Sequence, residues 1–134
     1  MTTRAYFDAS AIVKLVRHEP ETLALFDLLD RDLDACTSAL SEVEVMRALA
    51  RLGTPTADVG EALRSFYLVD IDAGVRARAA RLAPTGLRSL NAIHLATALE
   101  VGGDLTLVTY DDRLAEAARS MGLEVASPGL AVRD

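Results

Sequence analysis

Cysteine is almost absent from this chain of 134 residues. Cys36 is the single cysteine, so no intramolecular disulfide can form, and its apolar surroundings predict a small core residue. A chain without disulfides fits a reducing, cytoplasmic setting. Long apolar runs are missing as well: none reaches the roughly 18 residues that a membrane span requires, and no signal peptide opens the sequence.

Lysine is also scarce, since Lys14 is the only lysine among 14 basic residues. The net charge of −6 argues against a broadly basic surface for binding nucleic acid. It does not exclude an enzyme that acts on nucleic acid, because an acidic metal pocket itself contributes negative charge. A phosphoacceptor receiver domain usually needs a lysine after a late strand, and the lack of lysine after Lys14 disfavours that class.

The chain does contain a regular alternation of short β-type runs and longer helical runs. Its length fits one domain, predicted to span 1–134 with a tail from about residue 128. The alternation predicts an α/β fold in which helices wrap a mostly parallel sheet of about five strands. The strands are predicted near residues 4–7, 34–37, 66–71, 104–109 and 123–126. The helices are predicted near residues 10–17, 20–31, 39–52, 56–65, 73–82, 88–101 and 112–121.

Two of the predicted strands lead directly into acids, the first into Asp8 and the fourth into the pair Asp111 and Asp112. Ligands bind at the carboxyl ends of strands in a parallel sheet, so these carboxylates are expected at the binding edge. Each acid also has an ordinary explanation. Asp8 is a suitable N-cap for the helix near Ser10, and one acid of the pair is expected to cap the next helix. The other acid then stays free, and Asp111, nearer the strand end, is the better candidate ligand.

Glu44 lies in the helix predicted near 39–52, where two interpretations stay open. The spacing Ser41-x-x-Glu44 has the form of a capping box. At about 100° per residue, however, Glu44 shares a face with Arg47 and Arg51. That face is either an ordinary surface ion pair or the rim of a pocket with phosphate-binding groups. The opposite face is predicted to be core, with Val45, Met46, Leu49 and Ala50.

Asn91 is predicted in the first turn of the helix near 88–101, with Ser89 as the N-cap. His94 lies on the same side of that helix and is expected to be a hydrogen-bonded packing residue. His18, in a polar stretch, is expected in a solvated loop. The polar groups at these positions offer oxygen ligands without a cysteine or histidine cluster, which suits Mg²⁺ or Mn²⁺ and not zinc.

Four fragments of the chain, in this order, resemble the PIN domain, and in particular the VapC-type toxins of bacterial toxin–antitoxin pairs. Each fragment lies at the expected end of its element, and the likeness covers essentially the whole chain. The fragments are residues 6–11, Ser38-x5-Glu44-Val45-x-Arg47-Ala48, residues 87–96 and residues 109–114.

The resemblance implies a three-layer α/β/α fold and a metal-dependent endoribonuclease. Similar toxins form homodimers and are silenced by a small VapB-type antitoxin, whose C-terminal segment enters the acidic groove. DNA is contacted only through the antitoxin, which lets the complex repress its own operon. The implied metal positions are Asp8, Glu44, Asn91 and Asp111, with Asp112 as a further candidate and Ser10 and Thr109 as supporting hydroxyls.

Asn91 departs from the family pattern, which has aspartate at this position. An amide oxygen can still bind one cation, but it adds no charge and cannot bridge two metals, so metal affinity and hydrolysis are expected to fall. The chain is then either a naturally weakened homologue or the product of a deliberate substitution. The preserved pattern around Asn91 favours substitution.

The expected reaction is hydrolysis of an RNA phosphodiester by a metal-activated water, with Arg47 and Arg51 contacting backbone phosphates. The alternative is a catalytically inactive scaffold that binds antitoxin or RNA without cleavage, which Asn91 favours. A haloacid-dehalogenase-like phosphatase is disfavoured, because no second aspartate follows two residues after Asp8.

Overall fold

The computed structural model describes residues 3–130, and a five-stranded sheet in the order β3-β2-β1-β4-β5 forms its centre. All neighbouring strands in the sheet are parallel. The strands are β1 (Thr3–Phe7), β2 (Leu33–Ser38), β3 (Tyr67–Val69), β4 (Leu105–Val108) and β5 (Glu124–Ala126). The predicted parallel sheet is therefore confirmed, with each strand inside or within one residue of its expected range.

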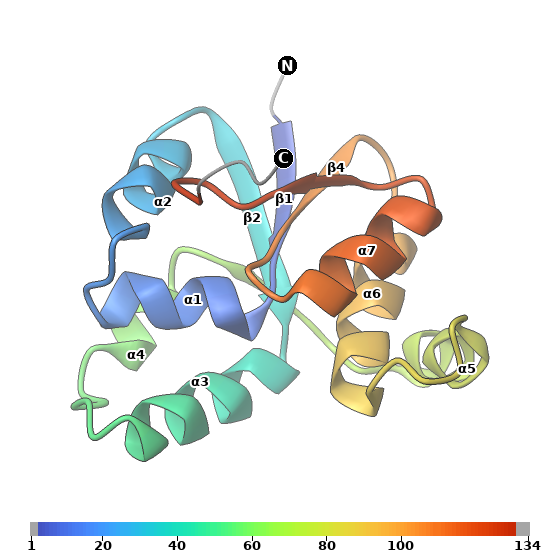
Figure 1. Ribbon diagram of the computed structural model, residues 1–134, viewed down its shortest axis with the longest axis horizontal. Helices are drawn as coiled ribbons and strands as arrows, with labels where there is room; N and C mark the ends of the chain where they lie inside the picture. Colours follow the sequence, from blue (N-terminus) through green and yellow to red (C-terminus); the bar gives the residue numbers. More distant parts are fainter. Residues whose placement is uncertain (1–2, 131–134) are drawn as a thin grey trace.

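Helices cover both faces of this sheet and complete three layers (Figure 1). The helices α1 to α4 lie on one side, and α5 to α7 lie on the other. Their bounds are α1 (Ala9–Val16), α2 (Thr22–Leu29), α3 (Leu40–Arg51), α4 (Val59–Leu63), α5 (Ala73–Arg81), α6 (Ser89–Val101) and α7 (Asp112–Ser120). The predicted α/β/α architecture is thus confirmed.

Successive side chains of β1 enter two separate hydrophobic clusters, because neighbouring residues of a strand point to opposite faces. Ala5 and Phe7 pack with α1 to α4, while Tyr6 packs with α6 and α7. All three side chains are at most 1% exposed. Cys36 is buried in the second cluster, as predicted, and burial raises the pKa of its thiol to about 11.

Glycines lie at the ends of two helices, close to the boundaries predicted near residues 52 and 101. Gly53 follows α3 and Gly102 ends α6, with φ values of 68° and 66° that favour a residue without Cβ. The helix α4 is shorter than the range predicted near 56–65. Its register leaves Val59 as the single buried anchor, and Gly60 within it weakens helix propensity.

The segment after β5 returns to the body of the molecule. The hydroxyl of Tyr110 donates to the carbonyl oxygen of Pro128 at 2.7 Å, and Ser127 Oγ donates to the carbonyl oxygen of Thr109 at 2.6 Å. Residues 128–130 of the expected tail are therefore in contact with the fold, and residues 131–134 lie outside the described residues. Between residues 3 and 130, no helix is long and apolar enough to cross a membrane.

Candidate functional site

The carboxyl ends of β1 and β4 bring Asp8 beside Thr109. The strands are paired with Phe7 opposite Val108, and the Asp8 amide donates to the carbonyl oxygen of Val108 at 3.2 Å. Residues separated by about a hundred positions along the chain therefore meet at one edge of the sheet. This is the edge at which ligands bind in open parallel sheets.

Asp8 is the N-cap of α1 and is also a buried charge. Its Oδ1 accepts hydrogen bonds from the Ala11 amide at 3.1 Å and from Ser10 Oγ at 2.7 Å. Its Oδ2 accepts one from Thr109 Oγ1 at 2.7 Å, and the side chain is 3% exposed. Burial raises the pKa of the Asp8 carboxyl, while nearby His94 and the hydroxyl donors oppose that rise. The capping and functional interpretations of Asp8 are therefore compatible.

The two expected supporting hydroxyls join the start of α1 to the turn after β4. Ser10 Oγ accepts from the Tyr110 amide at 3.0 Å, and Thr109 Oγ1 accepts from the Asp111 amide at 3.0 Å. Each hydroxyl also donates to a different oxygen of Asp8. These hydrogen bonds therefore fix the position of the turn after β4 relative to the Asp8 carboxylate.

Asp111, and not Asp112, is the cap of α7. Asp111 has extended backbone and its Oδ1 accepts from the Leu114 amide at 2.9 Å, while Asp112 is exposed in the first helical turn. The expectation that Asp111 is the acid left free of capping is therefore wrong, because an extended residue directly before the helix is the one that can reach its amide groups. Asp111 and Asp112 share a hollow of about 290 Å³ with Asn91, and its other lining residues are Arg88 and Arg113.

Glu44 reaches from α3 to a histidine on α6. Its Oε1 lies 2.5 Å from His94 Nε2, and His94 Nδ1 lies 2.6 Å from the Tyr6 hydroxyl. His94 is 1% exposed, which confirms the expected buried, hydrogen-bonded residue, and His18 is exposed as expected. The sequence reasoning missed that the partner of His94 is Glu44. No local pattern signals this contact, because Glu44 and His94 lie 50 residues apart on two different helices.

The buried face of α3 differs from the predicted one. Ser41, Val45 and Leu49 are buried at a spacing of four residues, whereas Met46 is 43% exposed and Ala50 is also exposed. Ser41 is not a cap, because α3 begins before it at Leu40, and its hydroxyl bonds to Thr37 Oγ1 at 2.7 Å inside the core. The capping-box interpretation of Glu44 is therefore wrong.

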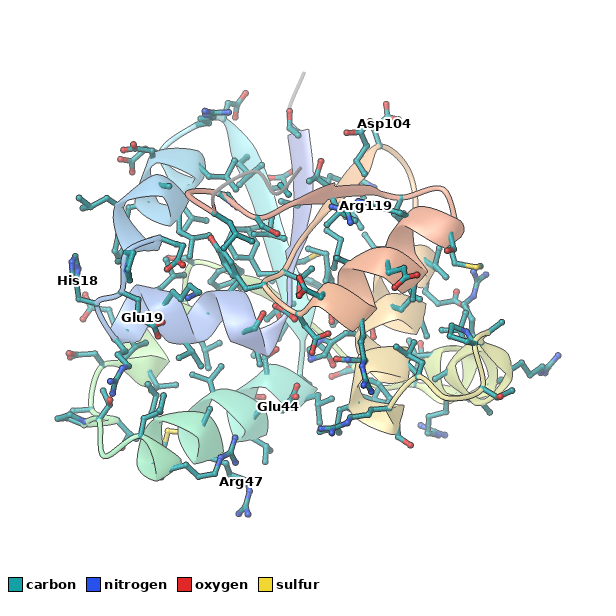
Figure 2. All side chains as sticks on the ribbon, viewed as in Figure 1. His18, Glu19, Glu44, Arg47, Asp104 and Arg119 are labelled. Carbon is teal, nitrogen blue, oxygen red and sulfur yellow. The ribbon has the colours of Figure 1, made fainter. Side chains whose placement is uncertain are left out.

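A second hollow, of about 330 Å³, lies between α1, α3 and the start of α6. Ser10 and Glu44 line it together with Arg47, Arg51 and Leu90, so both expected phosphate-binding arginines lie near the acid. Figure 2 shows Glu44 directed toward the centre of the molecule and Arg47 extending outward from α3. Leu90 lines this hollow and the next residue, Asn91, lines the other, so both hollows reach the start of α6.

The candidate donors suit a hard divalent cation by their chemistry, because they are carboxylate, amide and hydroxyl oxygens. They do not form a closed cage: within residues 3–130, no three or more aspartate, glutamate, histidine or cysteine side chains are grouped as a metal site. Asp8 accepts three hydrogen bonds, Glu44 bonds to His94, and Asp111 caps α7. The oxygens are therefore divided between two hollows: Asn91 lines one together with Asp111 and Asp112, and Glu44 lines the other together with Ser10.

Comparison with known proteins gives a consistent picture. The model of the PIN domain family matches residues 5–120. Ribonuclease VapC46 of Mycobacterium tuberculosis is 46% identical over 125 residues, which cover 92% of this chain and 96% of the relative. Ribonuclease VapC35 of the same organism is 47% identical over 134 residues, which cover 94% of this chain and 98% of the relative.

A solved toxin–antitoxin complex from Klebsiella pneumoniae contains a chain of similar fold, with a TM-score of 0.71 and 22% sequence identity. The match covers 92% of this chain and 97% of that chain. At this identity the likeness concerns the fold alone. The family model and the curated relatives, which match nearly the whole chain, confirm the resemblance: the chain belongs to the PIN-domain family and, within it, to the VapC group.

Proposed function

We propose that this chain is a metal-dependent endoribonuclease toxin that hydrolyses RNA phosphodiesters and is inhibited by a VapB-type antitoxin. The observation that carries the proposal is the buried Asp8 carboxylate, held by Ser10 and Thr109 at the carboxyl edge of the sheet. A buried carboxylate with a raised pKa in such a place is typical of a functional site. The curated relatives named as ribonucleases supply the reaction class.

In this proposal Asp8, Glu44, Asn91 and Asp111 hold Mg²⁺ or Mn²⁺, with Asp112 as a further ligand. A bound divalent cation activates water and stabilises charge on phosphate oxygens. The hydroxyls of Ser10 and Thr109 keep both oxygens of Asp8 in place. Arg47 and Arg51, which line the hollow beside Glu44, bind phosphates of the RNA backbone.

The decisive experiment compares RNA cleavage by this chain and by its Asn91→Asp variant in Mg²⁺. Because the variant restores a charge beside Asp111 and Asp112, we expect cleavage to rise by roughly 10- to 100-fold. Asp8→Ala in the Asn91→Asp background is the control and should abolish the gain. Equal cleavage by the parent chain and the Asn91→Asp variant would remove the proposed mechanism.

An inactive scaffold that binds antitoxin or RNA without cleavage is the second candidate. Asn91 favours it, because this neutral side chain occupies the hollow that Asp111 and Asp112 line. Calorimetry that detects Mg²⁺ binding, together with no cleavage by either form, would support the scaffold and contradict the nuclease.

The proposal places the protein in the cytoplasm as a homodimer bound to its antitoxin. Support for the antitoxin comes from the similar fold in the Klebsiella pneumoniae toxin–antitoxin complex. The structure offers apolar surface for protein partners on α2 and α3, where Leu23, Phe26, Val43 and Met46 are 43–68% exposed.

A further inference from the structure

His94 makes two side-chain hydrogen bonds that link three elements of the fold. The bond to Tyr6 connects α6 with β1, and the bond to Glu44 connects α6 with α3, across separations of 88 and 50 residues. Tyr6 and His94 are at most 1% exposed, whereas the Glu44 side chain is 21% exposed. Glu44 therefore connects a buried pair to the hollow that Ser10 also lines.

The Glu44 carboxylate determines which nitrogen of His94 carries a proton. Carboxylate oxygens only accept hydrogen bonds, so the contact between Glu44 Oε1 and His94 Nε2 requires a proton on Nε2. In a neutral imidazole Nδ1 is then the acceptor, and the buried Tyr6 hydroxyl donates to it.

This hydrogen bond fixes the position of one oxygen of the Glu44 carboxylate, Oε1. Within residues 3–130, the hydrogen bonds of the Glu44 side chain involve Oε1 alone, so Oε2 remains available to the hollow. Histidine and carboxylate pairs of this kind fix the orientation of a ligand group without touching the metal or substrate. A histidine that only filled space could bond to any nearby carbonyl oxygen, and it would not need an acid from another helix.

We infer that His94 is a positioning residue: anchored by Tyr6, it fixes Oε1 of Glu44 and presents Oε2 to a divalent cation at the carboxyl edge. The inference rests on the proposed function for the role of the cation. The chain of contacts from Tyr6 through His94 to Glu44 stands on the geometry alone.

The test measures Mn²⁺ affinity of the full chain by electron paramagnetic resonance of the free ion. His94→Leu, which keeps the volume but removes the donor, should weaken Mn²⁺ binding by roughly 10- to 100-fold. His94→Gln, whose amide can replace Nε2–H as a donor to Glu44, should remain much closer to the parent chain. Circular dichroism confirms that each variant is folded.

A double-mutant cycle with Glu44→Gln shows whether His94 acts through Glu44. In the Glu44→Gln background, His94→Leu should have little further effect on Mn²⁺ affinity. A full additional loss there, or unchanged Mn²⁺ binding by a folded His94→Leu variant, would overturn the inference.

Nitrogen-15 spectra of the His94 ring keep this inference separate from the proposed function. We expect a protonated Nε2 in the parent chain, a changed Nε2 signal in Glu44→Gln and a changed Nδ1 signal in Tyr6→Phe. If the parent chain binds no Mn²⁺, the metal-dependent function fails, and the ring signals still decide the positioning role: signals that are the same in all three proteins would refute it.

Discussion

The Asp8 carboxylate accepts three hydrogen bonds while almost all of its surface is removed from water. Neutral hydroxyl and amide donors only partly replace lost solvation, which is why the pKa of Asp8 stays raised. The position of Asp8 at the end of β1 was predictable from the apolar run before it. Its degree of burial was not, because the burial depends on Thr109, which β4 brings from the other end of the chain.

Asp8→Asn should stabilise the protein at neutral pH in the absence of metal, by roughly 1 kcal/mol or a few degrees in Tm. A carboxyl whose folded pKa is raised lowers stability as pH rises from its unfolded value of 3.8 through the folded pKa. The advantage of the variant over the parent should therefore grow across that window and then level off. Calorimetry of both proteins from acid to neutral pH checks this, with exposed Asp112→Asn as the control.

At the scale of helices, α6 begins without a side-chain cap. Arg88 occupies the N-cap position in extended conformation and makes no capping hydrogen bond, so the predicted cap at Ser89 is wrong by one residue. Arg88 instead lines the hollow with Asn91, Asp111 and Asp112. With arginine at this position the helix lacks the stabilising hydrogen bond of a cap, but a positive charge lies beside Asp111 and Asp112.

Arg88→Ser should supply the missing acceptor and raise the free energy of unfolding by about 1 kcal/mol. Urea denaturation measures the change. Arg88→Ala removes the same charge without adding an oxygen, so it serves as the matched control. Equal stability of the serine and alanine variants would show that the backbone of residue 88 does not permit capping.

Most helix and strand positions were predictable, because apolar periodicity and glycine at helix ends are local signals. The buried face of α3 was not. Met46 and Val45 are adjacent and both apolar, and the neighbouring elements decide which of them is buried. The contact between Glu44 and His94 was equally hidden, since it depends on how α3 and α6 lie across the sheet.

At the scale of the whole molecule, Lys14 joins three segments. Its Nζ lies 3.0 Å from Glu19 Oε2 and 3.1 Å from Glu21 Oε2, and 4.7 Å from the centre of the Tyr110 ring. The Lys14 side chain is 13% exposed. The hydrogen bonds to both glutamates raise the pKa of Lys14 against the lowering effect of burial, which is the largest single influence.

Lys14→Met should lower Tm more than Arg78→Met does. The Arg78–Glu100 pair has the same 3.0 Å separation, but its side chains are 43% and 38% exposed, and such pairs contribute little. Lys14→Met also leaves two partly covered glutamates without their cation and removes the contact with Tyr110. Thermal melts at low and high salt distinguish the variants, and similar losses in Tm would contradict this role for Lys14.

Tyr110 connects the segment after β5 to the start of α1. The ring rests under Lys14 and the hydroxyl holds Pro128, while the amide of the same residue donates to Ser10. A fusion partner or truncation introduced just after β5 would disturb Tyr110 and, through Ser10, the oxygens of Asp8. A label attached directly after β5 is therefore expected to alter the site around Asp8.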